Sequence, residues 1–338
     1  MLKPILAKLV EGHDLNEAEM KQAMTLIMEG KATDAQIGAF LVALRIKGET
    51  VTEITGAARV MREKAQHLEI KKDRPVVDTC GTGGDAQNTF NVSTATAFVV
   101  AGAGLKVAKH GNRSVSSQCG GADVLEALGV NLEVPPEVVA RCIEEIGIGF
   151  LFAPKFHPAM KYAIRPRKEL GLRTIFNILG PLTNPALADY QVMGVYDKKW
   201  LAPLAEVLKN LGLKGVMVVH GEGGYDEITV TGKTYVAELK DGVIKEYEIS
   251  PEALGLRRAD AGEIKGADKE SNARIIKEIL TAKERGAKQD MVLLNAAAAF
   301  KITGLAPDWQ RGIDMAKEVI ESGKAVEKLE KLVEMTQI

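Results

Sequence analysis

The sequence predicts an α/β protein in which a small all-helical unit precedes a larger domain built on a mostly parallel sheet. Helix patterns alone fill the first 70 residues, the polar stretch KKDRP follows at Lys71, and short apolar runs then alternate with helix patterns. Strands that alternate with helices favour a parallel sheet. The length of 338 residues agrees with two domains of the usual ~100–200 residues each. We therefore expect a helical domain over residues 1–70 and an α/β domain over residues 71–338.

The helices of the N-terminal unit have recognisable beginnings. Three times a capping residue is followed three positions later by Glu or Gln, and in this capping box each side chain satisfies a backbone N–H group of the other residue. The boxes pair Asn16 with Glu19, Thr33 with Gln36, and Thr50 with Glu53. They predict helices that end near residues 30, 46 and 66.

The larger domain shows strand and helix patterns in alternation. The expected strands are the apolar runs at 75–80, 105–111, 130–134, 147–153, 191–196 and 215–220. The expected helices lie at 93–103, 122–128, after Pro135–Pro136 and at 200–211, and three more start near Asn272, Ala287 and Asp308. Asp241-Gly242 between alternating runs predicts a hairpin. A basic helical segment from 157 to 184 interrupts the alternation, so we expect its part at about 165–185 to pack back on the helical domain.

The composition excludes several classes of protein. Forty-four basic and 45 acidic residues give a formal net charge of −1, whereas a nucleic-acid binder needs a basic excess or stripe. A small phosphorylated ligand needs only a local positive pocket. Three cysteines are too few for a disulfide scaffold, no apolar run approaches the ~20 residues of a membrane-spanning helix, and the N-terminus lacks a signal-peptide pattern. We expect a cytoplasmic protein with no nucleic-acid or membrane partner.

The first candidate site is the segment DTCGTGGD, from Asp78 to Asp85, which joins a short strand to a helix. Glycines at a helix start leave backbone N–H groups open to an anion. The spacing is neither that of a Walker A loop nor that of a Rossmann loop, and a plain glycine turn remains an alternative. Asp85, Ser93 and Thr94 favour a ribose and a metal-bridged phosphate as the ligand.

The second candidate site is KHGNRSVSS, from Lys109 to Ser117, at the end of another expected strand. Ligands of open α/β sheets bind beyond the carboxyl ends of the strands. Lys109 and Arg113 supply positive charge, the serines supply hydrogen-bond donors, and Asn112 can bind an amine or a carboxyl group. A polar surface loop is the weaker interpretation.

The third candidate site is GEGGYDE, which follows the strand GVMVVH directly. Its Asp226 and Glu227 can both reach a hard cation, and Mg²⁺ typically takes one or two carboxylates together with substrate phosphates and water. Adjacent carboxylates are more often solvated surface residues, but the place of this pair after a strand favours a metal site.

The fourth candidate site lies in the basic segment, where Arg167 could bind a substrate carboxylate with both arms of its guanidinium. His110 and His157 are the histidines that we expect in the site. The cysteines show no metal-ligand spacing.

Together and in this order, these segments resemble the anthranilate phosphoribosyltransferase family. The matching stretches are GTGGD with NTFNVST, KHGNRSVSS, ADVLEALGV, HPAMK, the run from Arg167 to Asn184, and GYDE. The resemblance implies transfer of the phosphoribosyl group of 5-phosphoribosyl 1-pyrophosphate (PRPP) to the amine of anthranilate in tryptophan biosynthesis. It also implies a nucleoside phosphorylase-like fold, a homodimer joined through the helical domains, and two Mg²⁺ ions, one of which bridges the PRPP pyrophosphate.

The resemblance also implies a role for individual residues. PRPP would be bound by Gly81, Gly84, Asp85, Thr89, Asn91, Val92, Ser93, Thr94, Lys109, His110, Gly111, Asn112, Arg113, Ser114, Val115, Ser116, Ser117 and Gly121. Mg²⁺ would be bound by Ser93, Asp226 and Glu227, and anthranilate by Gly81, Asn112 and Arg167, with His110 and His157 along its path. None of these residues forms a covalent nucleophile or a clear general base. We therefore expect a dissociative displacement at the ribose C1 through an oxocarbenium-like state.

Two stretches depart from the family pattern. Residues 118–121 read QCGG where the family usually has Lys-Ser-Gly-Ser, so a phosphate contact at Gly121 would use the backbone. Ala86 replaces a common glycine and should limit the loop to negative φ unless the loop is strained.

Three alternatives remain. A pyrimidine nucleoside phosphorylase would commonly carry a Lys-x-Ser-x-Arg pattern, which RPRKELGLRT does not contain. The same fold could act on another aromatic acceptor. A non-enzymatic helical interaction module would be expected to have lost the glycines, Lys109, Asn112, Arg167 and the Asp226-Glu227 pair, all of which are present.

Overall fold

The computed structural model describes residues 2–114 and 119–337. Within them, one seven-stranded sheet has the strand order β3-β2-β1-β4-β5-β6-β7. The strands are β1 (Val76–Asp78), β2 (Lys106–Gly111), β3 (Ile148–Phe152), β4 (Tyr190–Gly194), β5 (Gly215–Gly221), β6 (Thr234–Lys240) and β7 (Val243–Ile249). β1 to β5 are parallel, and β6 and β7 add an antiparallel edge. The mostly parallel sheet is confirmed.

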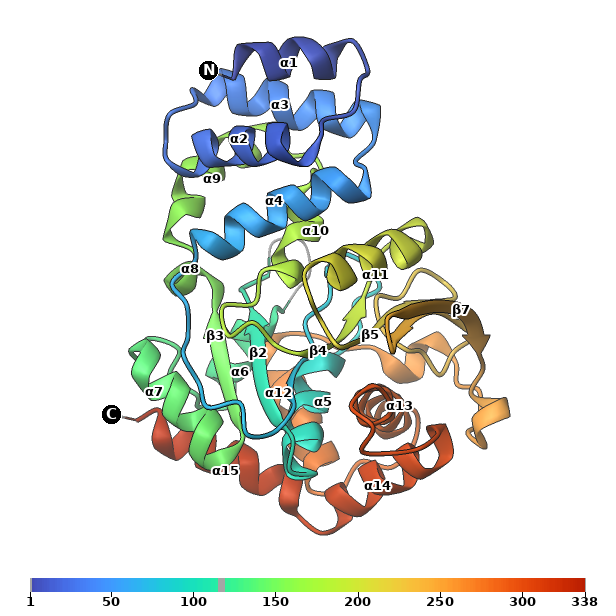
Figure 1. The fold of residues 1–338 in the computed structure, drawn as a ribbon. Coiled ribbons are helices and arrows are strands. Elements are labelled where there is room, and N and C mark those ends of the chain that lie inside the picture. Colours follow the sequence, from blue (N-terminus) through green and yellow to red (C-terminus); the bar gives the residue numbers. More distant parts are fainter. Residues whose placement is uncertain (1, 115–118, 338) are drawn as a thin grey trace.

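The N-terminal unit consists of four helices, which lie together at one end of the molecule (Figure 1). They are α1 (Lys3–Val10), α2 (Glu17–Met28), α3 (Asp34–Lys47) and α4 (Val51–Glu63). All three capping boxes are formed as predicted. α1 precedes the first of the three predicted helices.

The segment between β3 and β4 consists of short helices that reach back to this unit. They are α8 (Ala153–Phe156), α9 (Lys161–Leu170) and α10 (Phe176–Leu179), with 3₁₀ turns at Pro158–Met160 and Gly180–Leu182. α9 packs against α2 and α3, and α10 contacts α4. In Figure 1 this segment lies beside and below the helical unit.

The remaining helices cover both faces of the sheet. They are α5 (Val92–Gly102), α6 (Gly121–Ala127), α7 (Pro136–Arg141) with a π-helical turn at Cys142–Ile146, α11 (Leu201–Asn210), α12 (Lys269–Leu280), α13 (Ala287–Ile302), α14 (Trp309–Glu321) and α15 (Lys324–Met335). One hydrophobic core joins β1, β2 and β3 to α5, α13 and α15. A second core joins the other face of β4 and β5 to α11 and also includes the side chains of the helical unit. The helical unit is therefore packed onto the α/β domain.

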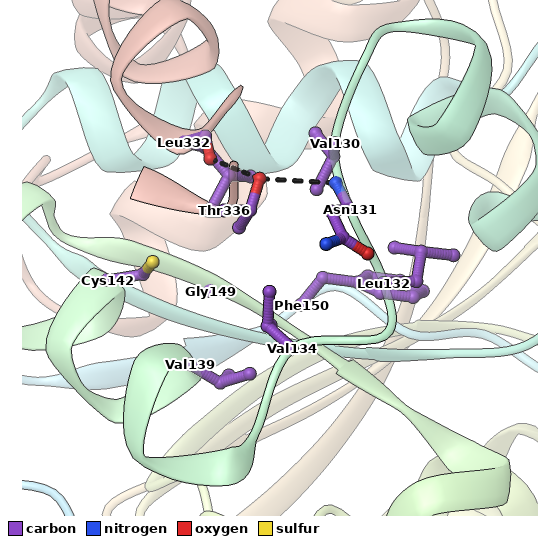
Figure 2. A pocket seen from close by; sticks show the side chains of 10 residues that line it. All are labelled: Val130, Asn131, Leu132, Val134, Val139, Cys142, Gly149, Phe150, Leu332 and Thr336. Atoms are coloured by element: carbon purple, nitrogen blue, oxygen red, sulfur yellow. Dashed lines mark hydrogen bonds between the residues drawn. The ribbon is translucent and has the colours of Figure 1, made fainter. Parts of the chain in front are cut away.

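The predicted strand at 130–134 is wrong. Val130, Leu132 and Val134 are buried, but they belong to a turn rather than to the sheet. Backbone N–H of Asn131 donates to Oγ1 of Thr336, 3.2 Å away, at the end of α15. Figure 2 shows this contact beside a small pocket between the turn, β3 and α15. Alternating burial can thus arise from packing against a helix as well as from strand pairing.

The predicted helix starts near Ala287 and Asp308 are confirmed, but the number of closing helices is wrong, because the described residues also form α15. α12 begins at Lys269, capped by Asp268, rather than near Asn272. Gly323, whose φ of +76° suits glycine, lies between α14 and α15 and changes the direction of the chain there. The hairpin at Asp241-Gly242 is confirmed, and both residues have positive φ as its turn requires.

No helix in the described part of the chain is both long and apolar enough to cross a membrane.

Candidate active site

The candidate segments meet where the parallel strands β1, β2 and β5 end. The glycine-rich segment follows β1, Asn112 follows β2, and the Asp226-Glu227 pair follows β5. This is the edge of an open α/β sheet at which ligands bind.

Close backbone packing fixes the glycine-rich loop. Backbone N–H of Thr82 donates to the carbonyl oxygen of Gly194 in β4 (2.9 Å), and a Cβ on Gly81 would lie only 2.8 Å from that oxygen. Gly83, Gly84 and Ala86 all have positive φ, and that of Ala86 is +58°. Ala86 is thus not limited to negative φ, and its backbone is in the left-handed region that disfavours a side chain.

Asp78, at the end of β1, connects the first two candidate sites. Its Oδ1 accepts hydrogen bonds from backbone N–H of Cys80 (3.0 Å) and His110 (3.2 Å), and its Oδ2 accepts from Nδ2 of Asn184 (2.7 Å). Burial raises the pKa of Asp78 to about 6, although the bond from Asn184 opposes the shift. One carboxyl group therefore holds the segments that follow β1 and end β2 in place relative to each other.

Lys109 points toward the start of α5. Its Nζ donates to Oγ1 of Thr79 and to Oγ of Ser93, each 3.2 Å away. Backbone N–H of Ser93 donates in turn to Oε1 of Glu227 (3.2 Å). Burial lowers the pKa of Lys109. These contacts bring residues of three candidate sites into one cluster: Thr79 follows β1, Lys109 lies near the end of β2, and Glu227 follows β5.

Three carboxyl groups face one another beside this cluster. Burial, followed by repulsion from Asp85, raises the pKa of Asp226 well above its usual value. Burial also raises the pKa of Glu227 to about 8, against the attraction of Lys109. Oδ2 of Asp85 is buried and has no hydrogen-bond partner among the described residues unless Asp226 is protonated, and a hydrogen bond between these two carboxyl groups also raises the pKa of Asp226. Nε2 of Gln87 donates to the carbonyl oxygen of Gly223 (2.8 Å) and ties the two carboxylate-bearing loops together.

This arrangement fits a hard cation that completes its shell with other ligands. Buried carboxylates that repel one another and leave an oxygen unpartnered are stabilised by a cation. Within residues 2–114 and 119–337, no three His, Cys, Asp or Glu side chains form a complete metal site by themselves. Mg²⁺ is commonly held by one or two carboxylates plus substrate phosphates and water, so the residues present fit it.

His110 and His157 lie side by side, with ring centroids 5.0 Å apart. Nδ1 of His110 is 3.2 Å from the carbonyl oxygen of Gly180, so Nδ1 carries the proton and Nε2 is an acceptor. Burial lowers the pKa of His110 to about 3 and that of His157 to about 4. Both Nε2 atoms are buried and have no hydrogen-bond partner among residues 2–114 and 119–337. Two neutral imidazoles thus present unused nitrogen atoms.

The basic residues differ in how far their charge is already engaged. Arg113 is paired with Glu126 and Asp123, so its charge is balanced within the protein. Arg167 stacks over the ring of Phe176 at 5.0 Å, and burial lowers its pKa. No ion pair of Arg167 occurs among the described residues.

The other predicted site residues occupy varied places. Asn91 donates a hydrogen bond to the carbonyl oxygen of Cys119 and accepts one from Asn272, Thr89 forms a β-bridge with Lys265, and Val92 belongs to the core. Oγ1 of Thr94 is buried with no hydrogen-bond partner among the described residues and lies 3.5 Å from the Cβ position of Gly121. Gly111 packs on Phe150, and backbone N–H of Ser114 donates to Asp123. Oδ1 of Asn112 accepts from backbone N–H of Arg113. Val115, Ser116 and Ser117 lie outside the described residues.

Comparison with known proteins identifies the family. Residues 3–65 match "Glycosyl transferase family, helical bundle domain", and residues 73–326 match "Glycosyl transferase family, a/b domain". A relative from Persephonella marina named anthranilate phosphoribosyltransferase is 54% identical over 337 residues, which cover 100% of this chain and 99% of the relative. This chain belongs to the anthranilate phosphoribosyltransferase family.

Solved structures of this family have the same fold. The anthranilate phosphoribosyltransferase of Thermus thermophilus superposes with a TM-score of 0.93 at 46% identity, covering 98% of this chain and 99% of that chain. The Saccharomyces cerevisiae enzyme, solved in complex with PRPP and Mg, superposes with a TM-score of 0.91 at 29% identity, covering 99% and 97%.

Sequence reasoning missed three residues that build this phosphoribosyltransferase site. Asn184 holds Asp78, and Asn295 of α13 holds the chain after Glu227 through both backbone groups of Ile228. A Cβ on Gly194 would lie 1.5 Å from the carbonyl oxygen of Asp226, so this position accommodates only glycine. Asn184 ends a stretch that resembles the family, but no local pattern shows what any of the three residues holds, because their partners are distant in sequence.

Proposed function

We propose that the residues at the carboxyl edge of the sheet carry out the family's reaction in this chain. The chain transfers the phosphoribosyl group of PRPP to the amine of anthranilate, giving N-(5-phosphoribosyl)anthranilate and pyrophosphate, a step of tryptophan biosynthesis. The observation that carries the residue assignment is the convergence of Lys109, Ser93 and Glu227 beside the glycine-rich loop. A cation, a helix start and a carboxylate within one cluster suit a pyrophosphate and its metal.

PRPP is proposed to lie across the glycine-rich loop and the start of α5. Backbone N–H groups of Gly81, Gly84 and Asp85 bind its phosphates, whereas that of Thr82 is already used by Gly194, and glycine lets the backbone approach closely. Lys109, which forms no ion pair within the described part of the chain, neutralises charge that develops on the departing pyrophosphate. Arg113 contributes less to phosphate binding than its charge suggests, because its guanidinium already forms ion pairs with Glu126 and Asp123.

The chain uses Mg²⁺, and we propose Ser93, Asp226 and Glu227 as its protein ligands. When bound, Mg²⁺ supplies positive charge that stabilises pyrophosphate as a leaving group. Two ions, one of them bridging the pyrophosphate, remain part of the proposal. The buried Oδ2 of Asp85 and the raised pKa values of Asp226 and Glu227 support a cation at this place.

Anthranilate is proposed to bind on the side of the basic segment. Arg167 binds its carboxylate, and Gly81 and Asn112 line the ring. The unpartnered Nε2 atoms of His110 and His157 accept hydrogen bonds from its amine. A neutral aromatic amine is a weak nucleophile, so the enzyme acts by positioning it against a ribose C1 that has developed oxocarbenium character.

The test is the loss of anthranilate fluorescence on mixing with PRPP, with and without Mg²⁺. Asp226→Asn with Glu227→Gln should shift the Mg²⁺ dependence to higher concentration, whereas Glu246→Gln, at an exposed position on β7, should not. Lys109→Ala should reduce turnover strongly, with Lys245→Ala as its exposed control. An unchanged metal response in the double variant would remove the metal assignment, and intact turnover in Lys109→Ala would remove the pyrophosphate role.

We also propose a cytoplasmic homodimer joined through the helical domain, taken as residues 1–70. Ile46 of α3 and Val10 of α1 are 81% and 75% exposed, which supports a contact there. Light scattering on the wild type and on Val10→Glu with Ile46→Glu tests it: a dimer that becomes a monomer agrees, and a monomeric wild type does not.

A further inference from the structure

Arg62 of α4 is a half-buried cation at the junction between the helical unit and the α/β domain. Its Nε donates to the carbonyl oxygen of Leu182 (2.7 Å), and its Nη1 donates to that of Leu211 (3.3 Å). No carboxylate forms an ion pair with it in the described part of the chain, and burial lowers its pKa to about 10. Leu182 ends a 3₁₀ turn and Leu211 caps α11, and such terminal carbonyls carry partial negative charge.

The turn that Arg62 contacts also forms hydrogen bonds to side chains of the candidate site. The carbonyl oxygen of Gly180 accepts a hydrogen bond from Nδ1 of His110, and the Thr183 backbone hydrogen-bonds to His157. Asn184, two positions after Leu182, donates to Oδ2 of Asp78 and to the carbonyl oxygen of Ala108. Residues 180–184 therefore determine where both imidazole rings and the Asp78 carboxyl group lie.

We propose that Arg62 is a positioning residue, which sets the turn 180–184 from the helical unit and thereby orients His110 and His157 toward anthranilate. Arg62 acts through the turn and touches no substrate. A guanidinium suits this place because its several N–H groups bond two carbonyls in fixed directions, and no carboxylate competes for them. The inference rests on the anthranilate side proposed above for the two histidines.

The effect should fall on one substrate more than on the other. If Asn184 shifts, Asp78 loses the hydrogen bond from Asn184 but keeps those from backbone N–H of Cys80 and His110. The loops proposed to bind PRPP therefore retain two of the three hydrogen bonds to this carboxyl group. The histidine rings have fewer alternatives, since each has one hydrogen bond to the turn and an unpartnered Nε2.

The test compares Arg62→Met and Arg62→Lys with Arg59→Met, a matched control. Arg59 lies on the same helix and also bonds to a carbonyl of the α11 end, that of Asn210, but it does not contact the turn. Arg62→Met should raise the KM for anthranilate roughly tenfold, in line with loss of a charge-assisted hydrogen bond, and the KM for PRPP less than about twofold. Arg62→Lys should recover part of the loss, and Arg59→Met should leave both KM values unchanged.

A second measurement does not depend on turnover. In ¹⁵N-labelled protein, the imidazole resonances of His110 and His157 should shift in Arg62→Met and Arg62→Lys but not in Arg59→Met. Unshifted resonances with wild-type KM for anthranilate would overturn the proposal, as would equal KM changes in the Arg62 and Arg59 variants. If Arg62→Met does not fold, Arg62→Lys decides by the same criteria. If the wild type itself does not consume anthranilate, the proposed site fails, while the resonances still decide whether Arg62 orients the histidines.

Discussion

Arg165 and Arg167 lie two positions apart on α9, but their surroundings differ. Arg165 is exposed and paired with Asp34 and Glu169, whereas Arg167 is partly buried over Phe176 without a carboxylate in contact. An unpaired guanidinium in a partly desolvated place binds an incoming carboxylate more strongly than a paired, solvated one.

We therefore predict that Arg167→Ala raises the KM for anthranilate by about 10- to 100-fold, equivalent to ~1.5–3 kcal/mol for a hydrogen bond to a charged group. The KM for PRPP should change little. Steady-state kinetics with each substrate varied in turn measures this, and Arg165→Ala is the control on the same helix. Equal effects of the two substitutions on anthranilate would contradict the assignment.

Ala86 stores backbone strain within the substrate loop. Its φ of +58° is disfavoured for a residue with a side chain. Ala86→Gly should raise the free energy of unfolding by about 0.5–1 kcal/mol, the left-handed penalty less the added entropy of an unfolded glycine.

Ala282, at φ +57° after α12, is a control for that prediction. Ala282→Gly should stabilise the protein similarly but leave the KM for PRPP unchanged, whereas Ala86→Gly should alter it. Thermal unfolding and PRPP kinetics measure both effects, and destabilisation by Ala86→Gly would show that the loop is not strained there.

At the scale of elements, the end of β4 determines where the carboxylates proposed to bind Mg²⁺ lie. The chain at Asp226 passes so close to Gly194 that a methyl group on Gly194 would overlap the carbonyl oxygen of Asp226. The same Gly194 accepts the hydrogen bond from Thr82 of the glycine-rich loop. One residue of one strand therefore spaces the PRPP loop from the carboxylate loop.

Gly194→Ala should raise the Mg²⁺ concentration for half-maximal activity at least about tenfold, because a forced shift of Asp226 costs ~1–3 kcal/mol. Activity titrated with Mg²⁺ measures this. Gly38→Ala within α3 is the control: nothing lies within 4 Å of its Cβ position, and it should stabilise the helix without changing the titration. An unaltered titration in Gly194→Ala would contradict this account.

At the scale of the whole molecule, the buried histidines connect the site to stability at acid pH. The pKa values of His110 and His157 are lowered to about 3 and 4, mainly by burial. Between pH 6.5 and about 4 these histidines are protonated in the unfolded chain but not in the folded protein. They therefore lower the free energy of unfolding as the pH falls.

His110→Asn with His157→Asn should remove that dependence. Relative to wild type, the double variant should gain up to ~1.4 kcal/mol per pH unit for each histidine as the pH falls from 6.5 to about 4. Urea unfolding at several pH values measures the difference. A difference that does not vary with pH would mean that both imidazoles take up their protons at the same pH in the folded protein as in the unfolded chain.

The sequence by itself determined the features that depend on neighbouring residues. Capping boxes such as Thr33 with Gln36 fixed the helix starts, Asp241-Gly242 fixed the hairpin, and the order of apolar runs fixed the α/β alternation. The motifs at strand ends were recognisable because a parallel sheet brings those ends to one edge. These signals act over a few positions and do not depend on how the chain packs.

Only the tertiary structure decided which side chains are available for chemistry. Asn184 reaches Asp78 across 106 positions, Arg62 reaches Leu182 across 120, and Gly194 meets the carbonyl of Asp226. Packing also decided that Arg113 is paired, that Arg167 is not, and that 130–134 is a turn against α15. Burial and long-range hydrogen bonds depend on the whole chain, and no local pattern of residues encodes them.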